Sequence, residues 1–176
     1  MDVRGCVCVC VCQNAYTSAD ETVYELLLPI DKPELLQNAL KVFAEFATRV
    51  VIADDDLDRE RGAVLEEWRQ GRTAAGRAAE AHWKLVLEGS RYAERLPIGL
   101  ESVIRKAPAS VVRGFYTKWY RPQNMAVVVV GDFPDTDAVV KLLGSTLGKV
   151  RRRERVRSCV SFHFVCGVLS WLCGGR

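Results

Sequence analysis

The chain has 176 residues, of which 49% are hydrophobic and 27% are charged. Such a composition is typical of a folded globular protein and excludes an intrinsically disordered chain, and the length suits one domain of ordinary size. The net charge is only +3, and much of the excess lies in the arginine-rich run at 151–157. Because no aromatic residues are interleaved with that run, we expect no nucleic-acid partner.

The seven cysteines lie near the two ends of the chain, and residues 13–158 contain none. A secreted disulfide scaffold would spread cysteines through its core, so the body is compatible with a reducing compartment. At the start, Gly5 to Cys12 alternates valine and cysteine. Four thiols on one face of a strand could bind a soft metal. We favour a low-complexity, artefactual start, because a GT dinucleotide repeat encodes this alternation.

The first patterned segment, Asn14 to Ile30, is rich in β-branched, aromatic and aliphatic residues and predicts a strand region that ends at Pro29. Asp31, with Glu34 three residues later, predicts the N-cap of a helix. That helix carries apolar residues at helical spacing up to Val50.

Two further helices are predicted next. One begins near Asp55 or Asp56, where acidic residues favour the positive end of a helix, and has Leu57, Val64 and Trp68 as its apolar stripe. The other covers 73–88 and ends at Gly89.

The last elements follow a turn at 96–99. A helix is predicted over 109–120, and the apolar run 125–131 predicts a strand buried on both faces. Asp135 or Thr136 would cap a final helix. This order predicts an α+β fold, with helices packed on a mixed or antiparallel sheet. Since only two strand regions are visible, we expect partner strands of the sheet to be missing.

The apolar segment 158–173 follows the arginine run and raises the alternative of a tail-anchored membrane protein. A membrane-spanning helix needs roughly 20 mainly apolar residues. This segment is shorter and contains His163 and three serines. A membrane partner is therefore not expected.

The pair Glu60 and Glu67 is the main chemical feature of the body. A spacing of seven residues places both on one helix face, about 10 Å apart along the axis. They lie beside the apolar stripe, so we expect partly buried carboxylates that need a partner. From spacing alone, glutamates on a solvated face, paired with Arg61 or Arg69, remain the ordinary interpretation.

The stretch from Glu60 to Glu67 resembles the second metal segment of the inverted zincins, the pitrilysin–insulinase family of zinc metallopeptidases. In that family a helix carries H-x-x-E-H, whose histidines bind zinc and whose glutamate activates water. The resemblance implies that Glu67 is the third zinc ligand. It also implies that Glu60 is the additional acidic residue that supports catalysis.

A second stretch, Asn14 to Ser18 followed by Glu21, Thr22 and Tyr24, resembles the family's edge strand downstream of the zinc helix. The resemblance implies a peptide substrate added to the sheet as a strand, with Asn14, Ala15 and Tyr16 binding it.

Residues 96–99 and 115–132 resemble the segment that joins the two halves of a family domain. The resemblance covers 13–150 and is nearest to the bacterial-type branch that also occurs in plants. It implies four regions: an artefactual start at 1–12, a partial N-terminal metallopeptidase domain without its zinc helix at 13–105, the start of the following domain at 106–150, and an unrelated tail at 151–176.

The chain departs from the family at the zinc motif. It contains no H-x-x-E-H, and its two histidines are His82 and His163. Counting back roughly 75 residues from Glu67, the family spacing, reaches beyond Met1, which indicates a truncated rather than a mutated motif. Three protein ligands are needed for catalytic zinc. We therefore expect zinc in the intact family but not in this chain, and expect His82 to be a helix-surface residue.

The predicted function is that of a fragment of a zinc metalloendopeptidase that does not cleave peptides by itself. The alternative is a non-catalytic, family-like subunit that binds peptides or acts as a scaffold. A compartment is not fixed: an organelle, either chloroplast or mitochondrion, and the cytoplasm both fit the sequence.

Overall fold

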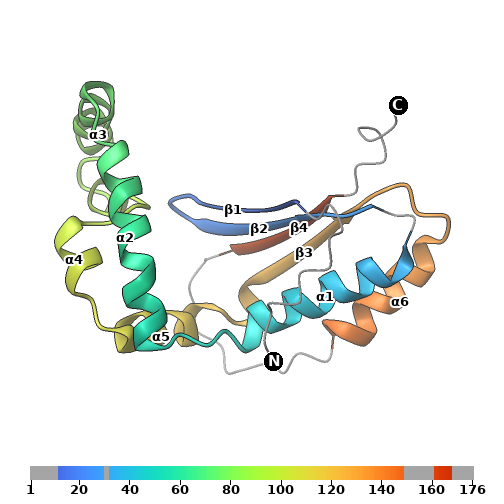
Figure 1. Ribbon diagram of the computed structural model, residues 1–176. Coiled ribbons are helices and arrows are strands. Elements are labelled where there is room, and N and C mark those ends of the chain that lie inside the picture. The colour runs from blue at the N-terminus through green and yellow to red at the C-terminus, as the bar shows by residue number, and fades with distance from the viewer. Residues whose placement is uncertain (1–11, 30–31, 149–160, 168–176) are drawn as a thin grey trace, which may run out of the picture. The chain divides into compact units, whose positions relative to one another are not determined.

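The computed structural model describes residues 12–29, 32–148 and 161–167 (Figure 1). The chain divides into two compact units. Among the described residues, the sheet unit comprises 12–16, 21–29, 32–50, 120–148 and 161–167, and the helical unit comprises 17–20 and 51–119. Each unit is described by itself.

The sheet has four strands in the order β1-β2-β4-β3. Their bounds are β1 (Cys12–Thr17), β2 (Glu21–Leu27), β3 (Met125–Val130) and β4 (Ser161–Gly167). β4 pairs in parallel with both β2 and β3, whereas the short turn at 18–20 makes β1 and β2 an antiparallel hairpin. The sheet is therefore mixed, and the predicted α+β fold is confirmed.

Strand β4 lies in a segment where no strand was predicted. It occupies the place between β2 and β3, with Glu21 opposite Ser161 and Met125 opposite Phe162. β4 is therefore one partner strand that was not predicted from the sequence. Aromatic and valine residues at 162–165 suit a strand, although the same apolar residues also raised the alternative of a membrane segment. The origin of residues 151–176 as an unrelated tail stays a prediction.

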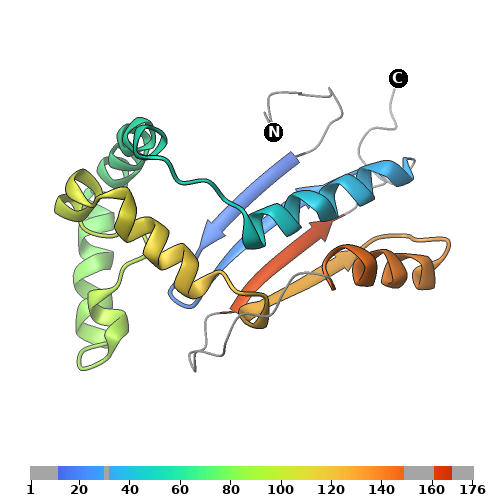
Figure 2. The ribbon, with the colours of Figure 1, turned by 90° about the horizontal axis from the view of Figure 1, so that it is seen from below.

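Helices α1 (Pro33–Thr48) and α6 (Thr136–Thr146) lie on one face of the sheet (Figure 2). α1 buries Leu40 and Phe43 completely, each with 0% of its surface exposed. Pro33 stands at the first helical turn, where its missing N–H costs nothing. The predicted cap Asp31 lies outside the described residues. At α6, the prediction is confirmed: the Asp135 carboxylate accepts a hydrogen bond of 3.0 Å from the Ala138 N–H.

The prediction that β3 is buried on both faces is wrong. Exposure alternates along the strand, and Val128 and Val130 are 44% and 59% exposed. The cause is the layering of the sheet unit, because α1 and α6 cover one face only (Figure 1). A run of valines therefore does not by itself distinguish a strand covered twice from one covered once.

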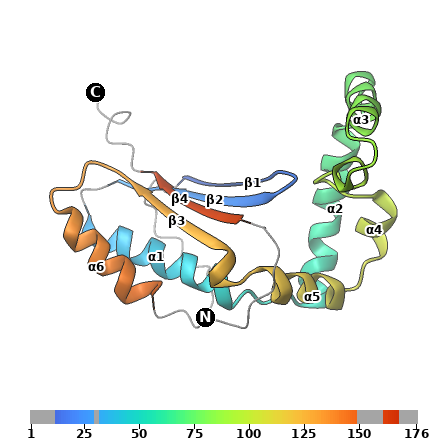
Figure 3. The same cartoon turned by 180° about the vertical axis from the view of Figure 1, so that it is seen from behind.

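The helical unit contains α2 (Asp54–Gln70), α3 (Ala74–Val86), η1 (Arg91–Glu94), α4 (Glu101–Lys106) and α5 (Ala109–Trp119). Figure 3 labels its four α-helices. The short helix η2 (Pro122–Asn124) precedes β3 in the sheet unit. α2 packs against α4 and α3 against η1. Arg61 of α2 donates hydrogen bonds to the carbonyl oxygens of Ile104 and Ala107, at the C-terminal end of α4. Across the described ranges, no helix is long and apolar enough to cross a bilayer.

Candidate functional site

Glu60 and Glu67 both lie on α2, as predicted from the sequence. Three aspartates open this helix, Asp54, Asp55 and Asp56, where their charge favours the positive end of the helix dipole. Both glutamates are exposed, so the expectation of partly buried carboxylates is wrong. The half-buried positions of α2 run from Leu57 through Arg61 to Trp68, and the glutamates stand at the margin of that face.

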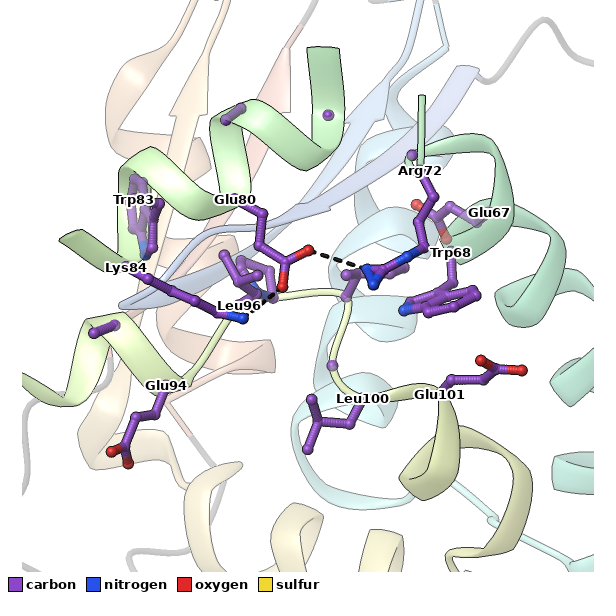
Figure 4. A pocket seen from close by; sticks show the side chains of 17 residues that line it. Glu67, Trp68, Arg72, Glu80, Trp83, Lys84, Glu94, Leu96, Leu100 and Glu101 are labelled. Atoms are coloured by element: carbon purple, nitrogen blue, oxygen red, sulfur yellow. Dashed lines mark hydrogen bonds and ion pairs between the residues drawn. The ribbon is translucent and has the colours of Figure 1, made fainter. Parts of the chain in front are cut away.

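Glu67 borders a cavity of about 710 Å³ that lies wholly within the helical unit (Figure 4). α2, α3 and the segment 93–101 form its walls. Two tryptophans supply much of its aromatic surface, Trp68 from α2 and Trp83 from α3. Glu60 is not part of the lining. Of the two glutamates singled out in the sequence, Glu67 therefore lines this cavity and Glu60 does not.

A group of ion pairs around Glu80 forms part of the cavity wall. Its carboxylate accepts a hydrogen bond of 2.7 Å from Lys84 and one of 3.1 Å from Arg72. The hydrogen bond from Lys84, opposed in part by burial and reinforced by both cations, lowers the pKa of Glu80 below its ordinary value of 4.5. Arg72 also lies over the Trp68 ring, 4.6 Å from its centroid. These contacts tie the end of α2 to α3.

The predicted turn at 96–99 forms the third wall. The Gly99 N–H donates to the Leu96 carbonyl oxygen at 2.9 Å, and Gly99 has a φ of 81°, which favours glycine. Nearby, the Trp83 indole N–H donates to the Tyr92 carbonyl oxygen at 2.9 Å, which fixes η1 on α3. The Tyr92 hydroxyl donates to Asp20 at 2.7 Å, and this bond raises the pKa of Tyr92.

The predicted substrate-binding residues Asn14, Ala15 and Tyr16 lie on β1, in the sheet unit. β1 is an outer strand of the sheet, and all three side chains are exposed, Tyr16 by 48%. An outer strand offers unpaired backbone groups to an extended peptide. The edge position is therefore consistent with the predicted role, while the peptide itself stays a prediction.

The residues present do not fit a catalytic zinc ion. Within 12–29, 32–148 and 161–167, no group of three or more histidine, cysteine, aspartate or glutamate side chains could hold a metal. A catalytic zinc ion needs three protein ligands, and Glu67 supplies one carboxylate. His82 lies exposed on α3 and belongs to no such group. We therefore derive no chemical step through zinc for this chain.

Several cavity residues were not predicted from the sequence. Glu80 and Lys84 are four residues apart on α3, a spacing that predicts an ion pair on a helix but not a cavity wall. Trp68 was predicted only as part of the apolar stripe of α2. Arg72 follows the end of α2, so helical spacing did not indicate that it lines a cavity.

Family models match most of the chain. The model described as Insulinase (Peptidase family M16) matches residues 9–91, and the model described as Peptidase M16 inactive domain matches 106–165. The chain belongs to the pitrilysin–insulinase family of zinc metallopeptidases. The predicted resemblance is thereby confirmed.

The relatives define the branch more narrowly. The chain is 60% identical over 132 residues to "Zinc protease PQQL-like" of Arabidopsis thaliana, which covers 75% of this chain and 14% of the relative. It is 36% identical over 137 residues to "Probable zinc protease PqqL" of Escherichia coli, covering 78% of this chain and 15% of the relative. The chain thus spans about one seventh of the curated relatives it matches.

Solved structures agree with the sequence relatives. The first half of the periplasmic protease PqqL from Escherichia coli matches with a TM-score of 0.70 and 32% identity, over 84% of this chain and 32% of that one. The ferredoxin protease FusC, in complex with Arabidopsis ferredoxin, matches with a TM-score of 0.70 and 25% identity. This match covers 84% of this chain and 16% of the FusC chain. The intact family therefore acts as zinc proteases, and zinc is its metal.

Proposed function

We propose that this chain is a part of a zinc metalloendopeptidase that supplies one zinc ligand and the substrate-pairing strand, and that it does not cleave peptides alone. The observation that carries the proposal is the placement of Glu67. It lies on α2 at the rim of a large cavity, in a family of zinc proteases, while the 176 residues contain no H-x-x-E-H.

In this proposal Glu67 would be the third zinc ligand, and Glu60, two helical turns earlier, would support the site electrostatically. The outer edge of β1, from Asn14 to Tyr16, would bind an extended peptide through backbone hydrogen bonds. An isolated carboxylate on an exposed helix face does not retain zinc, so hydrolysis is not expected from this chain.

Metal content and activity test the proposal. The purified chain should hold far less than one zinc per molecule and should show no chelator-sensitive cleavage of a quenched fluorescent peptide. In the Arabidopsis relative, substitution by glutamine at the position that matches Glu67 should abolish zinc binding. The same substitution at the position that matches Glu66 should leave zinc binding intact. Glu66 is a suitable control because it neighbours Glu67 on α2 and pairs with Arg69. Stoichiometric zinc in the chain alone would refute the proposal.

A second candidate function is a peptide-binding or scaffold subunit that never needs zinc. It is favoured by the exposed outer strand β1, since strand addition requires only backbone groups. The two candidates differ in one measurement. If extended peptides bind the chain and the glutamine substitution in the relative leaves its zinc content unchanged, the scaffold function is the correct one.

A further inference from the structure

The turn between β1 and β2 belongs to the helical unit. That unit includes residues 17–20, whereas the strands on both sides of the turn lie in the sheet unit, up to residue 16 and from residue 21. Thr17, the last residue of β1, is therefore part of the same unit as Glu67. A contact that holds this turn in the helical unit also holds the end of the strand that is proposed to pair with a peptide.

One such contact joins Asp20 of the turn to Tyr92 of η1. The Tyr92 hydroxyl donates a hydrogen bond of 2.7 Å to the Asp20 carboxylate, although 72 residues separate the two in the chain. Both residues lie in the helical unit. Because the acceptor is charged, this bond is stronger than one between two neutral groups. It connects the turn to η1 across a long stretch of sequence.

Tyr92 is itself bonded to the wall of the cavity that Glu67 lines. Its carbonyl oxygen accepts a hydrogen bond of 2.9 Å from the indole N–H of Trp83, which lines the cavity from α3. The two residues after Tyr92, Ala93 and Glu94, line the same cavity. Tyr92 thus contacts the cavity wall through its backbone and the turn through its side chain.

Peptide pairing with an edge strand depends on the geometry of that strand. The hydrogen bonds to the peptide require N–H and C=O groups that already point outward from an extended strand. A strand end that becomes ordered only when the peptide arrives costs conformational entropy, which lowers the affinity. Asp20 follows Thr17 by three residues. A fixed Asp20 therefore restricts the end of β1 before any peptide binds.

We propose that Asp20 and Tyr92 are positioning residues for the peptide substrate, and that their hydrogen bond holds the end of β1 in the extended geometry that pairs with the peptide. Neither residue touches the peptide in this proposal, because both act through β1. The inference rests on the proposed function, since it takes β1 as the peptide-pairing strand. It adds two residues, outside the strand and apart from the zinc ligand, on which substrate affinity depends.

Peptide titrations of the full chain test the inference. The probe is a fluorescein-labelled synthetic peptide of about 12 residues in which threonine, valine and lysine repeat, a composition that favours an extended strand. Its anisotropy should saturate with a Kd of about 10–300 µM, as expected for a short extended peptide. The same peptide with N-methylated backbone amides should not bind, because it lacks the N–H donors that pair with a strand edge.

Substitutions of the two residues isolate the effect of their hydrogen bond. Tyr92→Phe removes only the hydroxyl and should raise the Kd about fivefold, and Asp20→Ala should have a similar effect. Asp20→Asn keeps an oxygen that can accept the bond and should bind within about twofold of the parent. The variant that combines Tyr92→Phe with Asp20→Ala should bind within about twofold of either single variant, because each substitution removes the same contact.

A matched control accounts for the charge that Asp20→Ala removes, because the probe carries lysines. Glu88→Ala removes an exposed carboxylate from the same unit and should leave the Kd within about twofold of the parent. Urea midpoints test for a general loss of structure. Tyr92 and Asp20 are exposed, so both single variants should keep the midpoint of the parent. A merely structural role would lower the midpoint together with the affinity.

Three outcomes would overturn the inference alone. One is a Kd that Tyr92→Phe and Asp20→Ala leave unchanged, and another is a loss of affinity that Asp20→Asn shows as fully as Asp20→Ala. The third is a loss of affinity that follows a lowered urea midpoint. If the parent chain binds no peptide, the peptide-pairing role of β1 in the proposed function fails with the inference. Zinc content plays no part in these measurements, so the assignment of Glu67 is tested separately.

Discussion

The hydroxyl oxygens of Tyr24 and Tyr120 lie 2.6 Å apart, although 96 residues separate them in the chain. Their rings meet edge to face, with centroids 6.4 Å apart, and the ring centroid of Phe46 of α1 lies 5.4 Å from that of Tyr24. This contact joins β2 and α1 to the segment that leads into β3. It therefore connects the two stretches of chain that build the sheet unit.

Loss of one hydroxyl should be measurable in the stability of the sheet unit. Tyr24→Phe should lower the free energy of unfolding by about 1 kcal/mol, because the partly buried Tyr120 hydroxyl loses a partner. Tyr120→Phe should act similarly, and the double variant should lose less than the sum, with a coupling of about 0.5 kcal/mol or more. Urea denaturation of the four proteins measures this cycle. Strict additivity would show that the hydrogen bond contributes nothing.

Arg61 should be the most important charged residue of the helical unit. Its side chain is 18% exposed and bonds Asp58 as well as the two carbonyl oxygens at the end of α4. Arg61→Met should cost about 2 kcal/mol, because it leaves those carbonyl groups without a donor. Arg59→Met is the control on the same helix, since Arg59 is 73% exposed and pairs only locally with Asp56. It should cost less than about 0.5 kcal/mol in thermal or urea unfolding.

The core of the sheet unit should depend on Phe43. Its side chain is completely buried, so Phe43→Ala should lower stability by about 3–5 kcal/mol through lost transfer energy and a residual cavity. The adjacent Val42→Ala, at a position 36% exposed, should cost less than about 1 kcal/mol. Denaturation monitored by circular dichroism compares the two. Equal losses would mean that α1 does not pack on the sheet by the face described.

Stability should fall in acid through Glu80. Hydrogen bonding from Lys84 lowers the folded-state pKa of Glu80 below 4.5, so the carboxylate stabilises the fold above that value. The contribution is lost as the pH falls through the folded-state pKa. Glu80→Gln should therefore be less stable than the parent near pH 6, and this difference should be smaller near about pH 3.

Urea midpoints at the two pH values measure this effect. Glu88→Gln serves as the control, because Glu88 is exposed and forms no ion pair within the described part of the chain. It should leave the pH dependence of the parent unchanged. If Glu80→Gln lowers the urea midpoint by the same amount at both pH values, ionisation of the Glu80 carboxylate is not the cause of the lost stability.

Helices were the part of the fold that sequence reasoning located best. The capping residues Thr73 and Asp135 each accept a hydrogen bond from a backbone N–H three residues later, as their types predict. Gly89 follows the end of α3, where the sequence predicted the helix to stop. These signals are local, so a single sequence contains them in full.

Layering and exposure could not be predicted in the same way. The valines of β3 are equally apolar whether one or both faces are covered, and only the packing of α1 and α6 decides between these arrangements. The same limit applies to Glu60 and Glu67. Their spacing fixes a shared helix face, but which of them meets a cavity depends on α3 and the turn before α4. The role predicted for Glu67 came from the family resemblance and not from its spacing to Glu60.

The central place of β4 has a consequence for synthesis of the protein. β2 and β4 pair although Glu21 and Ser161 are 140 residues apart, and β3 reaches β2 only through β4. A nascent chain that has been synthesised as far as residue 130 therefore contains β2 and β3 but lacks β4, the strand that pairs with both. Pairings this distant form slowly and leave strand edges accessible meanwhile. Chaperones that shield such edges should raise the yield of folded protein more than a lower growth temperature does.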